Sequence, residues 1–193
     1  MAITESIFRE YDIRGEYPNQ INEDVVKKIG FAISHKCIDL GIDEICVGRD
    51  GRISGKSLLD ALIEGIIESG INVSNIDLAT SPLLYYAAKK NKNKSGVMIT
   101  GSHNPKNHNG IKLVINDNPV SGKEILALIN KGKPSSNSLG NVKEINIKDS
   151  YIKEVVDSSK INKDIKVVID CGNGAAGFIA PELYKKLGCE VTE

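Results

Sequence analysis

The stretch that decides the fold is SGVMITGSHNP, residues 95–105. Its apolar part, residues 97–99, predicts the end of a buried strand, and the polar residues that follow predict a loop. A loop that leaves a buried strand of an α/β protein emerges at the carboxyl edge of the sheet, where open α/β sheets bind their ligands. The sequence therefore places Ser102 and its neighbours at a ligand-binding edge.

Strand and helix patterns alternate on both sides of this stretch. Asn22 predicts a helix N-cap, and Ser81-Pro82 predicts the N-cap and first position of another helix. Ser121 and Glu124 predict a capping box. The alternation predicts an α/β fold, with a mixed, mostly parallel sheet and helices on both faces. The strands predicted for this sheet are residues 6–13, 44–48, 73–78, 96–100 and 111–115.

A change of composition divides the chain. Residues 131–145 are rich in Lys, Gly, Pro, Ser and Asn, which predicts a loop or an interdomain connection. We expect residues 1–145 to form one domain and residues 146–193 to be the incomplete start of a second α/β domain. That start contains a predicted helix at 149–158 and a β-α unit at 165–187. A domain does not normally end there, so we expect the chain to be a fragment.

Composition excludes several classes of protein. The 193 residues include 25 basic and 25 acidic side chains, so no net charge favours nucleic acid or an anionic membrane as a partner. No apolar run reaches the ~18 residues that span a bilayer, and the N-terminus has no secretory signal pattern. The four cysteines have no C-x-x-C spacing and lie in or beside apolar segments. Buried, reduced thiols in a cytoplasmic protein are therefore expected.

The serine loop has the residue types that phosphoryl transfer needs. Ser102 supplies a hydroxyl that can accept and return a phosphoryl group. Gly101 lets a phosphate approach closely, and Asn104-Pro105 stiffens the exit of the loop. His103 can accept or donate a proton, and Lys112 on the next strand can neutralise charge or move a proton. A plain polar turn is the alternative for this loop taken alone. A Ser-His-Asp hydrolase is disfavoured because adjacent Ser and His rarely face each other and no G-x-S-x-G motif is present.

Five motifs occur in a fixed order along the chain. Together they resemble the α-D-phosphohexomutase family, in its phosphomannomutase/phosphoglucomutase branch, over essentially the whole chain. The pair Thr100-Gly101 resembles this branch, whereas the related phosphoglucosamine mutases usually carry Ser-Ala there. The motifs are FREYDIRG (8–15), VGRDGRISG (47–55), SGVMITGSHNP (95–105), NGIK (109–112) and DCGNGAAG (170–177).

The resemblance implies a reaction and a nucleophile. Members interconvert hexose 1-phosphates and 6-phosphates, with a phosphoserine as donor and a hexose 1,6-bisphosphate as intermediate and activator. Ser102 matches the phosphoserine, and His103 and Lys112 match the residues proposed for proton transfer.

The resemblance also implies which residues bind the hexose phosphate substrate. Tyr11 and Arg14 match the segment that lines the site, and Arg49 and Arg52 match a basic loop near the serine. In charge terms these arginines are plausible partners for phosphate oxygens. A solvated loop with an internal ion pair is the alternative for Arg49 and Arg52.

The family further implies Mg²⁺, held by the serine phosphate at Ser102 and by three aspartates of a D-G-D-x-D-R loop. This loop does not occur in the sequence, and Asp164 and Asp170 do not match it. We therefore expect little or no mutase activity from the 193-residue chain, and a non-catalytic phosphosugar-binding module remains an alternative.

One motif has a competing interpretation. Residues 172–177, GNGAAG, fit the dinucleotide-binding pattern G-x-G-x-x-G, with Glu190 about 20 residues further on. The other motifs point away from an NAD-dependent enzyme, and the chain ends before a nucleotide domain could be completed. A tight β-α turn for close packing is the simpler interpretation.

Overall fold

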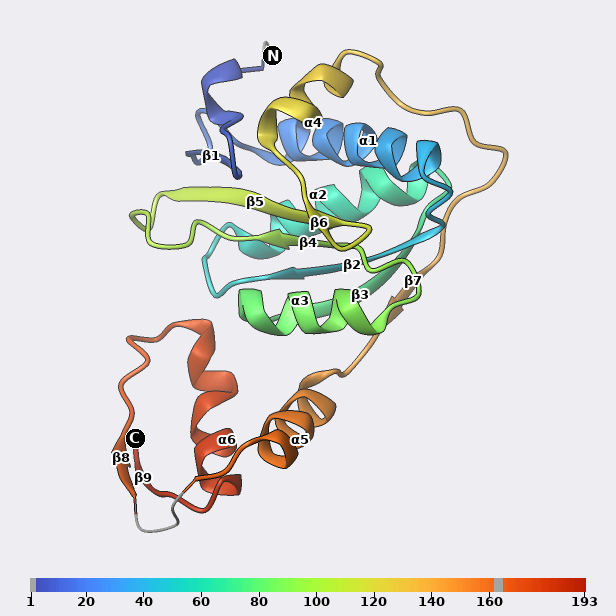
Figure 1. Cartoon of the computed structure of the whole chain (residues 1–193). Coiled ribbons are helices and arrows are strands. Elements are labelled where there is room, and N and C mark those ends of the chain that lie inside the picture. The colour runs from blue at the N-terminus through green and yellow to red at the C-terminus, as the bar shows by residue number, and fades with distance from the viewer. Residues whose placement is uncertain (1–2, 162–164) are drawn as a thin grey trace.

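The computed structural model describes residues 3–161 and 165–193, and it contains one large mixed sheet between layers of helices (Figure 1). The sheet has seven strands in the order β1-β5-β4-β2-β3-β7, with β6 beside β5. Both β1 and β4 pair antiparallel with β5, and β2, β3 and β7 pair parallel. Only β5 therefore opposes the others, as the predicted mostly parallel sheet requires. The strands are β1 (Ile13–Glu16), β2 (Glu44–Arg49), β3 (Asn72–Leu78), β4 (Gly96–Ile99), β5 (His108–Ile115), β6 (Asn118–Pro119) and β7 (Val142–Glu144).

Helices cover both faces of this sheet, as predicted. Along β4, Val97 and Ile99 belong to the larger core cluster, whereas Met98 belongs to the smaller one, because alternate side chains of a strand point to opposite faces. The larger cluster lies under α1, α2 and α4, and the smaller one lies under α3. These helices are α1 (Glu23–Asp39), α2 (Gly55–Glu68), α3 (Ser81–Lys90) and α4 (Gly122–Ile129).

Side-chain caps begin three of the helices, α1, α3 and α4. The Asn22 side chain accepts a hydrogen bond from the Val25 N–H, and Ser121 and Glu124 form the predicted capping box. The third helix differs by one residue from the prediction. Its N-cap is Thr80, whose hydroxyl accepts a hydrogen bond from the Leu83 N–H. Ser81 is therefore the first residue inside the helix rather than its N-cap.

Two predicted segments are corrected. Residues 6–13 do not form a strand: a 3-10 helix at Glu5–Ile7 precedes a turn in which the Arg9 N–H donates to the Asp12 carbonyl, and β1 begins only at Ile13. Residues 131–145 are not all loop, because β7 pairs parallel with β3. This exposed edge strand is held through its backbone and carries no apolar pattern that would predict it.

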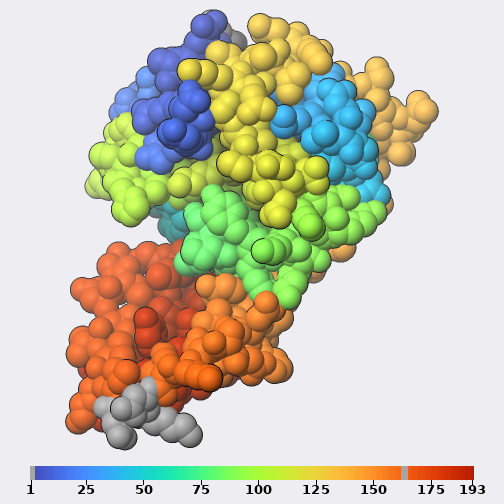
Figure 2. Space-filling view, viewed as in Figure 1, coloured from blue at the N-terminus to red at the C-terminus, as the bar shows by residue number. Residues whose placement is uncertain are grey.

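The C-terminal residues form a second, two-stranded sheet. It joins β8 (Lys166–Val168) in parallel to β9 (Glu190–Thr192), and the 3-10 helix η2 (Ala175–Phe178) and α6 (Ala180–Lys186) lie between them. In Figure 2 this orange and red part lies directly below the green segment that contains α3. Helix α5 (Lys148–Ser158) connects the two parts, with Ile152 fully buried in the smaller core cluster. The predicted domain division at 145/146 stays a prediction. Among the described residues, no helix is both long and apolar enough to cross a membrane.

Candidate active site

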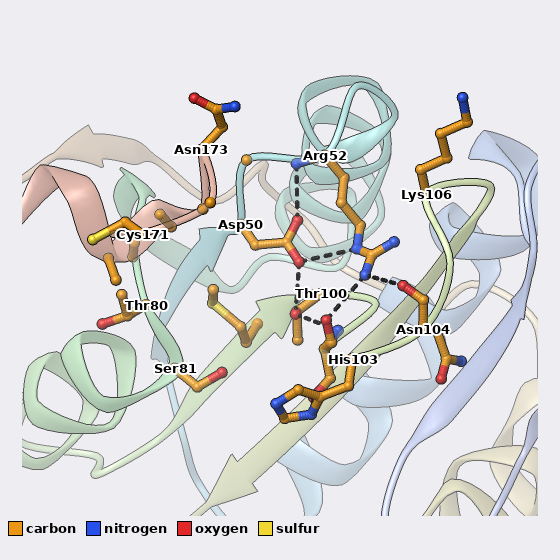
Figure 3. A pocket seen from close by; sticks show the side chains of 18 residues that line it. Asp50, Arg52, Thr80, Ser81, Thr100, His103, Asn104, Lys106, Cys171 and Asn173 are labelled. Atoms are coloured by element: carbon orange, nitrogen blue, oxygen red, sulfur yellow. Dashed lines mark hydrogen bonds and ion pairs between the residues drawn. The ribbon is translucent and has the colours of Figure 1, made fainter. Parts of the chain in front are cut away.

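A pocket of about 780 Å³ opens at the carboxyl ends of the parallel strands (Figure 3). Its walls are loops that follow β2, β3, β4 and β8, which is the edge where ligands bind in open α/β sheets. Ser102 and His103 line it from the loop after β4, as the strand pattern predicts. Cys171 and Asn173 line the opposite wall, so the glycine-rich turn of the second sheet faces the serine loop. The lining segments are residues 50–52, 79–81, 98–106 in part, and 171–176.

The Ser102 backbone is in the left-handed region, with φ of 52°. A residue with a Cβ pays about 1–2 kcal/mol for this conformation, so it persists only where surrounding contacts hold it. A tight turn supplies part of that support, because the Asn104 N–H donates to the Gly101 carbonyl at 3.0 Å. The Ser102 N–H donates to the Thr100 hydroxyl at 2.9 Å. The nucleophile predicted from sequence is therefore a strained, held residue.

The Ser102 hydroxyl faces a proton carrier. Its Oγ lies 3.1 Å from Nδ1 of His103, within hydrogen-bond distance. Adjacent Ser and His side chains rarely face each other, and here the turn at Ser102 brings the two to one side. The contact lets His103 take or return the hydroxyl proton.

Arg52 is bound to the serine loop rather than open to the pocket. Its side chain is only 13% exposed, and its Nε donates to the Asp50 carboxylate at 3.2 Å. Nη1 and Nη2 each donate to two backbone carbonyl oxygens of the loop. Those acceptors and distances are Pro105 at 2.6 Å, His108 at 2.9 Å, Ser102 at 3.0 Å and Asn104 at 2.7 Å. Figure 3 shows the guanidinium beside the loop residue Asn104.

Asp50 and Thr100 connect Arg52 to the other end of Ser102. The Thr100 hydroxyl donates to Oδ2 of Asp50 at 2.7 Å while it accepts the Ser102 N–H. Asp50 also accepts the backbone N–H of Arg52 at 3.1 Å. Neither Asp50 nor Thr100 was predicted as a site residue. The signal that could have found them is their position, since each directly follows a buried strand beside a motif residue.

Gly101 has a packing role that the sequence did not predict. A Cβ at this position would overlap the Arg52 guanidinium carbon, so the missing side chain makes room for Arg52. The φ of Gly101 is outside the left-handed region, which Ser102 adopts instead. The close approach of a phosphate to Gly101 stays a prediction.

Two of the other predicted site residues, Arg14 and Lys112, lie near the serine loop or on a strand beside it. The Arg14 guanidinium donates to the Asn104 side-chain oxygen at 3.1 Å and pairs with Asp12, so it contacts the serine loop. Lys112 is in register with Met98 on β4, and directly paired residues of antiparallel strands share a face of the sheet. Lys112 therefore lies on the same face of the sheet as Met98, which lines the pocket, but Lys112 is not itself among the lining residues.

Tyr11 and Arg49 are not among the residues that line the pocket. The Tyr11 side chain is 86% exposed. The Arg49 guanidinium donates to both carboxylate oxygens of Asp77, at 2.8 and 3.3 Å, and this ion pair joins the ends of β2 and β3. The substrate-binding roles of Tyr11 and Arg49 stay predictions. An ion pair within the basic loop, the alternative expected from the sequence, forms between Arg52 and Asp50, whereas Arg49 pairs outside the loop with Asp77.

A magnesium site is not completed by the described residues. Among them, no group of three or more His, Cys, Asp and Glu side chains could hold a metal ion. A phosphate on Ser102 would supply one ligand only. Asp164, set aside as a ligand on sequence grounds, lies outside the described residues.

The fold and the site define an α/β/α domain that presents one held serine at the carboxyl edge of its sheet. Residues 5–135 match the family model for phosphoglucomutase/phosphomannomutase, alpha/beta/alpha domain I. The chain therefore belongs to the phosphoglucomutase/phosphomannomutase family, as the ordered motifs predict.

Proteins of this family match the sequence over nearly the whole chain. It is 45% identical over 192 residues to a phosphomannomutase/phosphoglucomutase of Pseudomonas putida, a match that covers 98% of this chain and 42% of the relative. It is 42% identical over 196 residues to a phosphoglucomutase of Neisseria gonorrhoeae, with 100% and 43% covered. A crystal structure of a family member from Burkholderia thailandensis superposes with a TM-score of 0.94 at 32% identity, covering 100% of this chain and 44% of that one. The chain thus spans less than half the length of these relatives.

Proposed function

We propose that the protein is a hexose phosphate mutase, which interconverts hexose 1-phosphates and 6-phosphates through a phosphoserine at Ser102. The observation that carries the proposal is the Ser102 hydroxyl at the pocket, in a strained backbone held at both peptide groups and 3.1 Å from His103. Family membership and the names of the relatives from Pseudomonas and Neisseria support glucose and mannose phosphates as substrates.

The reaction that phosphorylates the serine is a direct exchange of two P–O bonds. Oγ of Ser102 attacks one phosphorus of a hexose 1,6-bisphosphate, so that the Oγ–P bond forms while the sugar O–P bond breaks. The hydroxyl proton passes to Nδ1 of His103, and the leaving sugar oxygen takes up a proton, for which Lys112 is the predicted donor. In the second transfer the other hydroxyl of the hexose attacks the phosphoserine, so that a new sugar O–P bond forms while the Oγ–P bond breaks. The proton of the attacking hydroxyl passes to Lys112, and His103 returns its proton to Oγ of Ser102.

Charge and position supply the rest of the catalysis. Phosphoryl transfer depends on holding the reacting oxygens in line and on neutralising the equatorial oxygens. Arg14 at the serine loop and Lys112, on the same face of the sheet as Met98, are the cations we assign to that neutralisation. A metal ion, which the family resemblance implies, would need ligands beyond those that the described residues provide.

The test is the phosphorylation of Ser102. The 193-residue chain is incubated with glucose 1,6-bisphosphate, and its peptides are analysed by mass spectrometry. We expect a gain of about 80 Da on the peptide that contains Ser102, and no gain in Ser102→Ala. His103→Gln should slow the gain about 100-fold, the usual contribution of a positioned acid or base. A phosphate on another residue, or an equal gain in Ser102→Ala, would exclude the proposal.

For the chain by itself we expect little or no complete turnover, since the described residues contain no metal site to stabilise the transferred group. A coupled assay with glucose 1-phosphate measures this. A turnover rate equal to that of a full-length mutase of the family under the same conditions would contradict the expectation. Binding of the bisphosphate without transfer to Ser102 would instead favour the phosphosugar-binding module.

A further inference from the structure

The Arg52 guanidinium uses every N–H group that it has. An arginine carries five such donors. In the structure one of them binds the Asp50 carboxylate and four bind carbonyl oxygens of the serine loop. In this arrangement none is left for a substrate phosphate, and the substrate-binding role of Arg52 stays a prediction.

Four carbonyl oxygens that converge on one point need a cation. These oxygens lie within the seven residues from Ser102 to His108, and without the guanidinium they would repel one another. The Pro105 carbonyl also accepts from the His108 N–H, whereas Arg52 is the donor that holds the Ser102 and Asn104 carbonyls. Since Arg52 is only 13% exposed, water cannot readily replace it. A planar five-donor group fits such an array, whereas a lysine ammonium offers three donors around a point charge.

The same ion pair holds both peptide groups of Ser102. Arg52 binds the Ser102 carbonyl directly, at 3.0 Å. Asp50 binds the Thr100 hydroxyl that accepts the Ser102 N–H. Resting on the proposed function, we propose that Arg52 is a positioning residue: its guanidinium, through these five hydrogen bonds, holds Ser102 in the left-handed conformation from which Oγ exchanges its phosphate. We refer to this arrangement as the Arg52 clamp.

A substitution at Gly101 tests the Arg52 clamp without changing Arg52 itself. A Cβ at Gly101 would overlap Cζ and Nε of Arg52. Gly101→Ala should therefore displace the guanidinium and reproduce the loss caused by Arg52→Ala. Once Arg52 is gone, the added methyl group has nothing to displace. The two substitutions should then be strongly non-additive, as expected of residues in direct contact.

The experiment follows the rate of Ser102 phosphorylation at increasing concentrations of glucose 1,6-bisphosphate. Arg52→Ala should lower the maximal rate about 100-fold, the effect of misplacing a reacting atom by about 1 Å, with little change in the half-saturating concentration. Gly101→Ala should show a similar loss, and the double variant should lose no more than about threefold beyond either. Arg52→Lys should recover part of the rate, and free guanidinium should restore Arg52→Ala. Lys56→Ala, an exposed cation on α2, controls for loss of charge.

A direct readout of the loop separates the clamp from the proposed reaction. In Arg52→Ala and Gly101→Ala we expect the amides of residues 100–108 to exchange hydrogen at least about tenfold faster, while amides of α1 and α2 keep their protection. If the unmodified chain takes up no phosphate at Ser102, the proposed reaction fails, and this exchange experiment alone decides the clamp. Unchanged exchange in the loop, losses that multiply in the double variant, or a loss confined to half-saturation would each overturn the clamp.

Discussion

The strain at Ser102 predicts that glycine at this position gives a more stable protein than alanine, while both abolish phosphorylation. Ser102→Gly and Ser102→Ala both remove the hydroxyl, whose hydrogen-bond partner is the exposed His103, and they differ only in the Cβ. At φ of 52° the Cβ costs about 1–2 kcal/mol. Glycine loses about 0.5–1 kcal/mol more conformational freedom on folding. The difference leaves Ser102→Gly more stable than Ser102→Ala by about 0.5–1 kcal/mol.

Thermal unfolding followed by circular dichroism measures this difference. In a chain of this length 1 kcal/mol shifts Tm by about 2–4 °C, so Ser102→Gly should melt about 1–4 °C above Ser102→Ala. The matched control is the same pair at Lys28, an exposed position inside α1, where glycine should be less stable than alanine by about 1 kcal/mol. The sign should thus reverse between the two positions. Glycine below alanine at both positions would refute the assignment of strain to Ser102.

Three further predictions concern packing and titration. Gly65→Ala should destabilise the chain by about 1–2 kcal/mol in urea unfolding, because a Cβ would overlap the Lys27 carbonyl oxygen and overpacking outweighs the better helix propensity; equal or higher stability would contradict this. Hydrogen bonds from Lys148 and then Lys186 lower the pKa of Glu182 to about 2. Their stabilisation is therefore present above the usual value of 4.5 and is lost as pH falls toward 2, and an NMR titration of the carboxyl group with a midpoint near 4.5 would disprove it. Burial raises the pKa of the Cys37 thiol to about 12, so at pH 8 it should resist alkylation when folded and react when unfolded; rapid reaction in the folded chain would count against this.

Features that depend on neighbouring residues were predictable from sequence. The Asn22 cap and the Ser121–Glu124 capping box join atoms three residues apart, so their geometry follows from the helix itself. The strand at 96–99 and its polar loop were predictable because a short apolar run that ends in polar residues has few other solutions.

Features that depend on distant residues were not predictable in this way. Strand β7 is exposed and polar, and only its backbone pairing with β3, about seventy residues earlier, makes it a strand. The apolar pair Ile7-Phe8 is compatible with a strand or with a short helix, so the sequence pattern does not reveal the 3-10 helix at Glu5–Ile7. Neither error affects the position of the pocket, since both segments lie away from its lining residues.

By itself, the sequence determined the main alternation of strands and helices, the serine at the carboxyl edge of the sheet and, through five ordered motifs, the family. The tertiary structure decided what the residues around Ser102 do. Arg49 and Arg52 are nearly equivalent in the sequence, yet one pairs with Asp77 and the other binds the serine loop. The physical reason is that a guanidinium takes its role from the acceptors around it, and those of Arg52 lie about fifty residues away along the chain. Only folding brings these oxygens to Arg52, and with them the strained, held conformation of the serine.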